Sequence, residues 1–219
     1  AEAFRKVKKQ GGIIIHNHPA WRRDTSDKTP FHEEVYGAGL IDGVEVVNGS
    51  TLYPKMVDRC VDEELTIFAN TDCHRTSAQY FPRGGEIFRT MTFILAKECT
   101  EKAVKDALLK RRTLAYSGGE LMGEEKWLVE FANAAVDCRL VSENGGKKND
   151  SHIYSLTNKS SVTIRLRRGK TIYELEPFRT TTVSYSKNKN GEYGRPTFTI
   201  ENMWHIDYQH PKVVFEIDK

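Results

Sequence analysis

The sequence lacks a long apolar run, a cysteine pair spaced for a zinc finger, and an excess of charge of either sign. No apolar run approaches the roughly 18 residues of a membrane helix, so we expect no membrane span. The four cysteines form no CxxC pair, which argues against a finger-type zinc site. There are 33 basic and 30 acidic residues, and this balance indicates no nucleic-acid-binding surface.

What the sequence does contain is enough apolar material for a core, arranged in two different patterns. Hydrophobic residues make up 38% of the 219 positions. Apolar runs at 13–16, 43–47 and 65–70 are almost continuous, as in parallel strands that are covered on both faces. Helical patterns separate them, which predicts repeated βα units. Further elements are expected as strands at 91–96 and 113–117 and as helices at 2–10, 31–38, 54–63 and 101–110.

The second pattern begins after a helix expected at 124–136. From residue 137 onward, short alternating runs such as VTIRLR and PTFTI are separated by turn-rich segments. This spacing predicts an antiparallel β domain of the sandwich type. The predicted fold class is therefore α/β plus all-β, with domains at 1–123 and 137–219 and a linking helix at 124–136.

Ionisable side chains gather where the three apolar strands end. His16 and His18 close the first strand, Glu45 lies within the second, and Asp72 and His74 follow the third. Parallel strands place their carboxyl ends at one edge, where βα folds build their sites. Residues two apart on an extended chain face the same way, so we expect both imidazoles to face one point.

Imidazole and carboxylate ligands together suit zinc, manganese or iron. A pair of such metals can hold a hydroxide that attacks phosphorus in line. Two alternatives stay open for the flanking residues. His16 can be a ligand or a satisfied polar residue, and Glu45 can contact metal or pair with an Arg or Lys. Cys73 lies between two expected ligands, and alternation predicts that it packs away from the metal.

The motifs HNHP, DGVEVVNG and ANTDCH, in this order, resemble the later part of the polymerase-and-histidinol-phosphatase (PHP) superfamily. They are most similar to bacterial PHP-type phosphodiesterases, over about residues 1–123. The resemblance implies a distorted (β/α) barrel with a metal-dependent phosphoesterase site of two or three metals. It maps metal ligands onto His18, Asp72 and His74.

The same resemblance suggests supporting roles around these ligands. Asn17 and Asn48 are expected to hydrogen-bond ligating groups or metal-bound water. Arg22, Arg75 and Arg89 are candidates to contact the phosphate of a small phosphate-ester substrate, because guanidinium suits phosphate oxygens. For any one of them, an ordinary surface charge is the alternative interpretation, and it is the one favoured by the sequence alone.

One departure from the family pattern is that its opening HxH motif is not found in these 219 residues. The HxH at 16–18 does not replace it, since its His-Pro turn belongs to the later motif. We therefore expect about half of the metal site, no activity from the chain alone, and weak metal binding or none. An exposed barrel edge would then favour self-association.

Two other functions stay open. A degenerate half-barrel with a β domain can serve as a non-catalytic module that binds a glycan or a protein. Metal-dependent amide hydrolysis on a related barrel is a third reading, but it usually calls for a carbamylated lysine or another histidine spacing.

Overall fold

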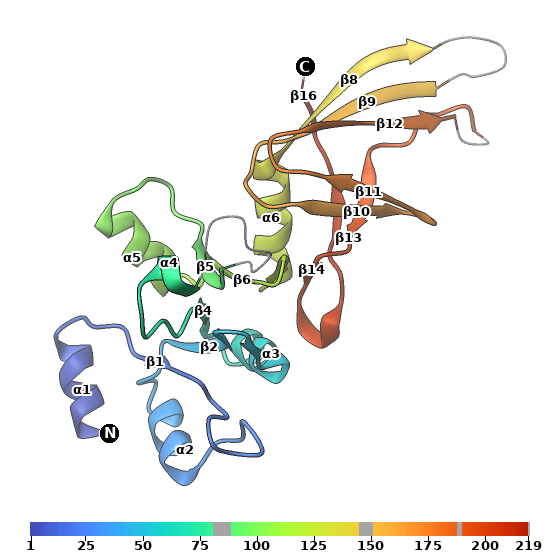
Figure 1. Cartoon of the computed structure of the whole chain (residues 1–219). Helices are drawn as coiled ribbons and strands as arrows, with labels where there is room; N and C mark the ends of the chain where they lie inside the picture. The colour runs from blue at the N-terminus through green and yellow to red at the C-terminus, as the bar shows by residue number, and fades with distance from the viewer. Residues whose placement is uncertain (81–88, 145–150, 188–189, 219) are drawn as a thin grey trace. The chain divides into compact units, whose positions relative to one another are not determined.

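The chain forms two compact units in a computed structural model that describes residues 1–80, 89–144, 151–187 and 190–218. Unit 1 comprises residues 1–127 and 205–207, and unit 2 comprises 128–204 and 208–219. Helix α6, Glu125–Ala135, contains the point at which the chain passes from the first unit to the second (Figure 1).

Unit 1 is built on a small parallel sheet, as the apolar runs predicted. Strand β2 (Gly43–Asn48) pairs in parallel with β1 (Ile15–His16) and with β4 (Thr66–Asn70). The short β3 (Thr51–Leu52) returns antiparallel to β2. Helices α1 (Glu2–Lys9), α2 (Pro30–Gly37) and α3 (Pro54–Asp62) separate the strands.

Local sequence explains where two of these helices begin. Both α2 and α3 carry proline in the first turn, where its missing N–H costs no helical hydrogen bond. Thr29 caps α2 by accepting from the backbone N–H of His32, and His32 Nδ1 accepts from the N–H of Thr29 in return. This reciprocal capping box orients the His32 ring at the start of the helix.

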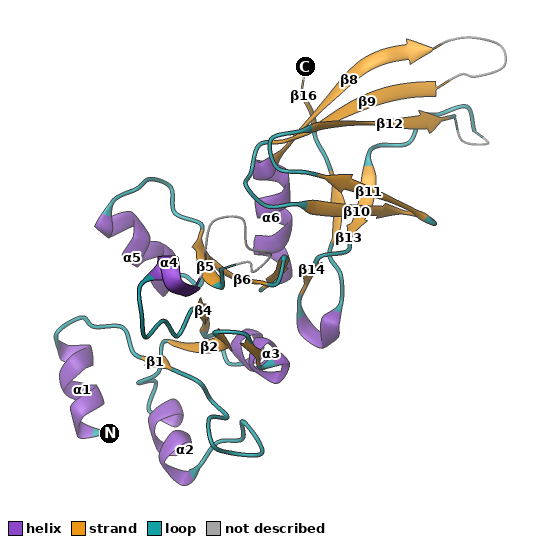
Figure 2. Ribbon diagram, viewed as in Figure 1, coloured by secondary structure: helices purple, strands orange, loops and turns teal. Residues whose placement is uncertain are grey.

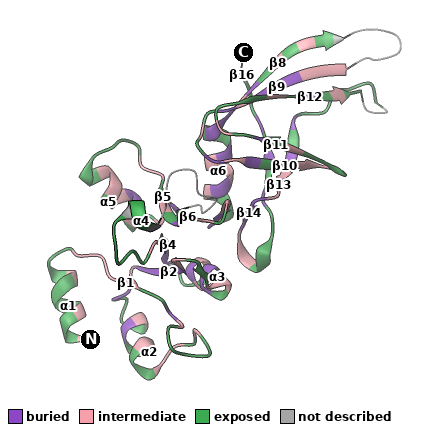
Figure 3. Cartoon of the chain, viewed as in Figure 1, coloured by how far each residue is buried: buried purple, intermediate pink, exposed green. Residues whose placement is uncertain are grey.

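The core of unit 1 is centred on β2, whose residues 43–47 are all buried (Figure 3). Gly43 is needed there because a Cβ would lie 2.4 Å from the carbonyl oxygen of Thr66 and 2.6 Å from the Phe68 ring. From α3, Met56, Val57 and Cys60 are fully or almost fully buried. The β2 strand is thus the rigid element on which neighbouring loops are placed.

The later strands of unit 1 do not continue the parallel series. Strand β5 (Met91–Ile94) runs antiparallel to β6 (Thr113–Ser117), which pairs antiparallel with β7 (Glu120–Met122). Helix α5 (Glu101–Leu109) lies between β5 and β6 in the sequence. The expectation of repeated βα units is wrong here, because sequence spacing alone does not set the direction of pairing.

The segment 71–89 connects β4 to β5. It contains helix α4 (Ser77–Tyr80), and residues 81–88 lie outside the described part of the chain. Thr92 on β5 links back to β4: its hydroxyl accepts from the N–H of Ala69 and donates to the carbonyl of Ala69.

Unit 2 is built almost entirely from β-strands (Figure 2). One sheet has the order β12-β9-β8-β16 and another the order β11-β10-β13-β15. The pairs are antiparallel except that β16 runs parallel to β8, which the alternating pattern did not predict. The strands are β8 (Val136–Asn144), β9 (Ser151–Asn158), β10 (Ile164–Arg168), β11 (Thr171–Leu175), β12 (Thr180–Ser186), β13 (Thr197–Ile200), β14 (Met203–Trp204), β15 (Lys212–Val214) and β16 (Ile217–Asp218).

Among the described residues, no helix is both long and apolar enough to cross a membrane. The fold is thus mixed α/β with many strands in several sheets.

Candidate functional site

Glu45 is the centre of the candidate site, and it is 2% exposed within β2. Its Oε2 accepts from the backbone N–H of His18 at 2.6 Å and from Asn48 Nδ2 at 3.1 Å. Its Oε1 accepts from Asn70 Nδ2 at 2.9 Å. These donors are all neutral, so the hydrogen bonds that the structure describes give Glu45 no cationic partner. A buried carboxylate needs such donors to offset its lost hydration.

The three donors come from the carboxyl ends of three neighbouring strands. His18 follows β1, Asn48 ends β2, and Asn70 ends β4. Gly49 adds a backbone link, since its N–H donates to the carbonyl of Asn70 at 2.8 Å. One buried side chain therefore holds together the segments that carry His18, Asn48 and Asp72.

Three residues with left-handed backbone lie in or next to these segments. His18 has a φ of 34°, Asp72 a φ of 50° and Arg22 a φ of 56°. Residues other than glycine seldom adopt this left-handed region, and they keep it where the surroundings enforce it. Two of the three predicted ligands thus occupy strained backbone beside the Glu45 network, which is a common property of functional sites.

The ligands predicted after β4 lie next to each other. His74 Nε2 is 3.3 Å from Asp72 Oδ1, with the His74 side chain 77% exposed and that of Asp72 47% exposed. Burial, followed by the negative charges of Glu45 and Asp72, raises the pKa of Tyr53. In the described ranges, no group of three or more His, Cys, Asp or Glu side chains is close enough to hold a metal. Assignment of His18, Asp72 and His74 as ligands stays a prediction.

His16 contacts different residues from His18. Its Nδ1 lies 2.7 Å from the Tyr36 hydroxyl, and its ring centroid is 4.4 Å from that of His32. The His18 ring is 5.4 Å from that of Trp21. Because β1 ends at His16 and the backbone of His18 is left-handed, the strand alternation behind the expectation of a shared direction does not extend to His18.

Burial and the neighbouring His32 lower the pKa of His16 from 6.5 to about 4. The ring is therefore neutral at physiological pH, as a metal ligand or a hydrogen-bonding partner requires. The described contacts of His16 favour the role of a hydrogen-bonded polar residue over that of a metal ligand beside Glu45.

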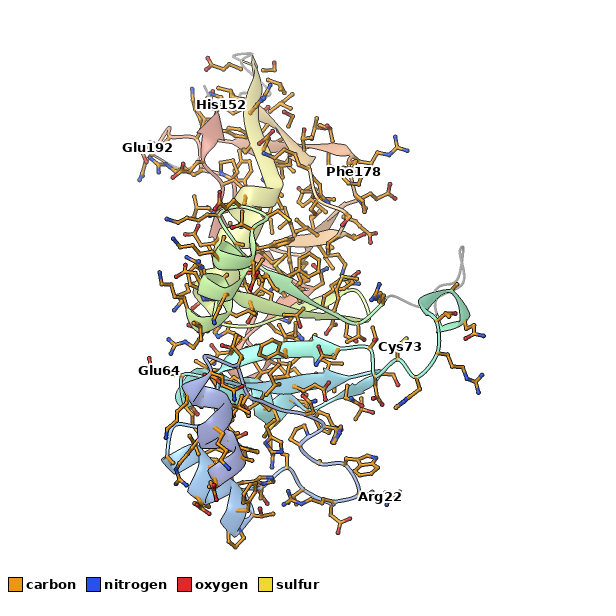
Figure 4. The ribbon with its side chains drawn as sticks, turned by 90° about the vertical axis from the view of Figure 1, so that its left-hand side faces the viewer. Arg22, Glu64, Cys73, His152, Phe178 and Glu192 are labelled. Atoms are coloured by element: carbon orange, nitrogen blue, oxygen red, sulfur yellow. The ribbon has the colours of Figure 1, made fainter. Side chains whose placement is uncertain are left out.

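The predicted phosphate-binding residues are placed in the loops around this edge. The Arg22 guanidinium stacks 4.4 Å from the centre of the Trp21 ring, and Trp21 is 59% exposed. Arg75 and Arg89 are exposed, as is Asn17. Cys73 is exposed too, so its predicted packing role is wrong: it lies beyond the end of β4, where strand alternation no longer applies. Figure 4 shows Arg22 and Cys73 on loops on the same side of unit 1.

Several residues of the site were not found from the sequence. Asn70 ends β4 two residues before Asp72, and its terminal position was the available signal. Thr90 donates to the carbonyl of Gly49 at 2.6 Å and contacts the Ser117 hydroxyl at 3.0 Å. No local sequence pattern marks Thr90, because its partners are far away along the chain.

Comparison with known proteins now adds to this geometry. No protein-family model and no curated protein matches the chain. A crystal structure of a two-domain protein from Bacteroides vulgatus ATCC 8482, described as containing a predicted PHP-like metal-dependent phosphoesterase, does match, with 30% sequence identity and a TM-score of 0.83. The likeness covers 97% of this chain. The predicted resemblance to the PHP superfamily is confirmed.

The chain spans 64% of the length of that PHP-like protein. This partial coverage fits the expectation that the chain resembles the later part of such a protein. The description of that protein names no particular substrate and no particular metal ion.

Proposed function

We propose that the chain carries part of a metal-dependent phosphoesterase site, and that the parent activity is phosphodiester hydrolysis. The observation that carries this proposal is the Glu45 network, which joins the strained segments bearing His18 and Asp72 at the carboxyl edge of the parallel sheet. A buried carboxylate that holds three loops at the carboxyl edge of a parallel sheet is typical of a preorganised binding site.

The donor chemistry fits a divalent metal. His18, Asp72 and His74 would hold it, and two imidazoles with one carboxylate suit zinc, manganese or iron. Asp72 and His74 are already adjacent and open to solvent. When bound, such a metal supplies Lewis-acid stabilisation of phosphoryl charge.

The chain's own residues have separate tasks in this proposal. Glu45 fixes the backbone of His18 and the amides of Asn48 and Asn70, so it positions the ligands without touching the substrate. Arg22 after β1, Arg75 after β4 and Arg89 before β5 would contact the phosphate group. Trp21 holds the Arg22 guanidinium by stacking. This contact reduces the conformational entropy that the Arg22 side chain would lose when it binds phosphate.

Several finer features belong to the same proposal. The parallel strands would form part of a distorted (β/α) barrel, and unit 2 would be a β-sandwich. The ligand set on these residues would be about half of a two- or three-metal site. We infer that the chain by itself binds metal weakly and is inactive.

The test is metal content and hydrolysis of a bis-phosphate ester, measured for this chain and for a longer chain that adds the family's opening HxH motif. We expect activity with manganese or zinc in the longer chain, and loss of at least about 100-fold on Asp72→Asn. Lys102→Gln, an exposed change on α5, is the matched control and should retain activity. Activity that survives Asp72→Asn, or that is absent from the longer chain with every metal, would contradict the proposal.

The runner-up is a non-catalytic binding module built on a degenerate half-barrel and a β domain. The absence of a gathered three-ligand group among the described residues favours it. A longer chain that stays metal-free and inactive would support this reading.

A further inference from the structure

Trp21 is a large aromatic side chain in the loop after β1, and it is 59% exposed. The chain has three tryptophans. Trp127 is half-buried and Trp204 is only 3% exposed. Tryptophan is highly buried on average, because the indole carries a large apolar surface. Trp21 is therefore the tryptophan of this chain whose ring is open to a ligand.

The Trp21 ring lies beside a predicted metal ligand. Its centroid is 5.4 Å from that of the His18 ring, and the two ring planes meet at 51°. Because the rings are tilted, His18 does not cover the indole as a parallel stacked ring would. A group that packs against Trp21 would thus lie close to the imidazole that is predicted to hold the metal.

The backbone of this turn limits where Trp21 can lie. The N–H of Trp21 donates to the carbonyl of His18 at 2.9 Å, and Pro19, between them, is buried. Proline fixes its own φ, and His18 and Arg22 hold left-handed φ values of 34° and 56°. A constrained turn therefore presents the indole, so a ligand has little backbone to order when it binds.

Arg22 provides a cation next to the same ring. Its guanidinium carbon lies 4.4 Å from the centroid of the Trp21 ring, and Figure 4 shows Arg22 on this loop. Within the described ranges, no ion pair involves Arg22. Guanidinium suits phosphate oxygens, and an exposed indole suits a flat π-system. A ligand that carries both a phosphate and a planar ring would match these two neighbouring residues.

We propose that Trp21 is a specificity-determining residue that stacks against a planar aromatic ring of the substrate. The inference rests on the proposed function, since it names the class of phosphodiester: one whose ester group carries an aryl ring or a nucleobase. Saturated rings and chains have no π face, so they gain less from contact with the indole. Arg22 contacts the phosphate while Trp21 holds the ring.

An NMR titration of the whole chain in EDTA tests this inference with three phosphodiesters. Diphenyl phosphate carries aryl rings, a thymidine dinucleotide carries nucleobases, and dicyclohexyl phosphate carries saturated rings of the same size as phenyl. At least one of the first two should bind at least about tenfold more tightly than dicyclohexyl phosphate. The same ligand should shift the Nε1–H resonance of Trp21, which is identified by its loss in Trp21→Leu.

Three variants separate stacking from a structural effect. Trp21→Leu should reduce the preference for the aromatic diester to within about twofold, and Trp21→Tyr should keep a preference of severalfold, because it retains a π face. Phe178→Leu is the matched control. Phe178 is an exposed aromatic residue of unit 2, 69% exposed, and its replacement should leave the preference unchanged.

The arms of the titration also identify the ring. Tighter binding of diphenyl phosphate alone indicates an aryl ester, that of the dinucleotide alone indicates a nucleobase, and that of both indicates any planar ring. Equal binding of all three diesters, no binding of any, or a preference that survives in Trp21→Leu would overturn the inference.

The titration needs neither metal nor turnover, so its outcome is distinct from that of the proposed hydrolysis. A longer chain that is inactive with every metal would contradict the phosphoesterase function and leave the ring preference of this chain in place. A longer chain that hydrolyses phosphodiesters, combined with no ring preference here, would contradict the role of Trp21 alone.

Discussion

Glu45 shows how one buried side chain can organise residues that are distant in sequence. Its carboxylate accepts from donors contributed by three strand ends. The sequence marked Glu45 as unusual because an acid among valines in a buried strand needs partners. It left open whether the partner would be a metal, an arginine or a lysine, and the structure describes neutral amides instead.

Replacing Glu45 tests this role. Glu45→Ala should lower the free energy of unfolding by about 2–4 kcal/mol, because buried N–H donors lose their acceptor. Glu45→Gln should cost about 1 kcal/mol, since one amide oxygen keeps two of the donors and the Asn70 amide can turn to accept the third hydrogen bond. Urea unfolding measures both variants.

The control for Glu45 is Glu2→Gln on α1, where Glu2 pairs with Lys6 and its side chain is 82% exposed. That change should stay within about 0.5 kcal/mol. An alanine variant as stable as the wild type would show that Glu45 is not the organising residue.

At the scale of elements, the paired strands β2 and β4 approach closely because of glycine. The approach leaves no room for a methyl group at Gly43, which faces the Thr66 carbonyl and the Phe68 ring. This requirement depends on the register of β2 against β4, which the sequence does not reveal.

Gly43→Ala should therefore destabilise the chain by about 1–3 kcal/mol, since both strands would have to move apart. Gly37→Ala is its matched control: Gly37 ends α2, and a Cβ there would meet nothing within 4 Å. The control should be neutral or stabilising by up to about 1 kcal/mol. Thermal unfolding compares the two, and equal melting temperatures would contradict the packing argument.

At the scale of the whole molecule, the β1 edge of the parallel sheet bears on how the chain associates. Strand β1 lies at one end of the path β1-β2-β3, and within the described ranges it pairs with β2. Unpaired backbone on an edge strand favours pairing with another chain.

We expect the chain to self-associate through this edge. Its weight-average sedimentation coefficient should rise with protein concentration. High salt should not abolish the effect, since backbone pairing depends little on charge screening. A constant monomeric value over a wide concentration range would contradict the prediction.

The sequence by itself determined the parallel run β1, β2 and β4, the onset of the β-rich second half, and the motifs that resemble the PHP superfamily. These features are local: apolar runs, capping residues and short ordered motifs are read from neighbouring residues. The same local information placed His18, Asp72 and His74 at strand ends.

Only the tertiary structure decided the antiparallel pairing of β5 with β6, the direction of His16 toward Tyr36, and the donors around Glu45. It also brought the ring of His16 to 4.4 Å from that of His32, which lies on another element. Each of these depends on strand direction, register and side-chain packing between distant segments. Those are set by the free energy of the whole folded unit, which local patterns do not contain.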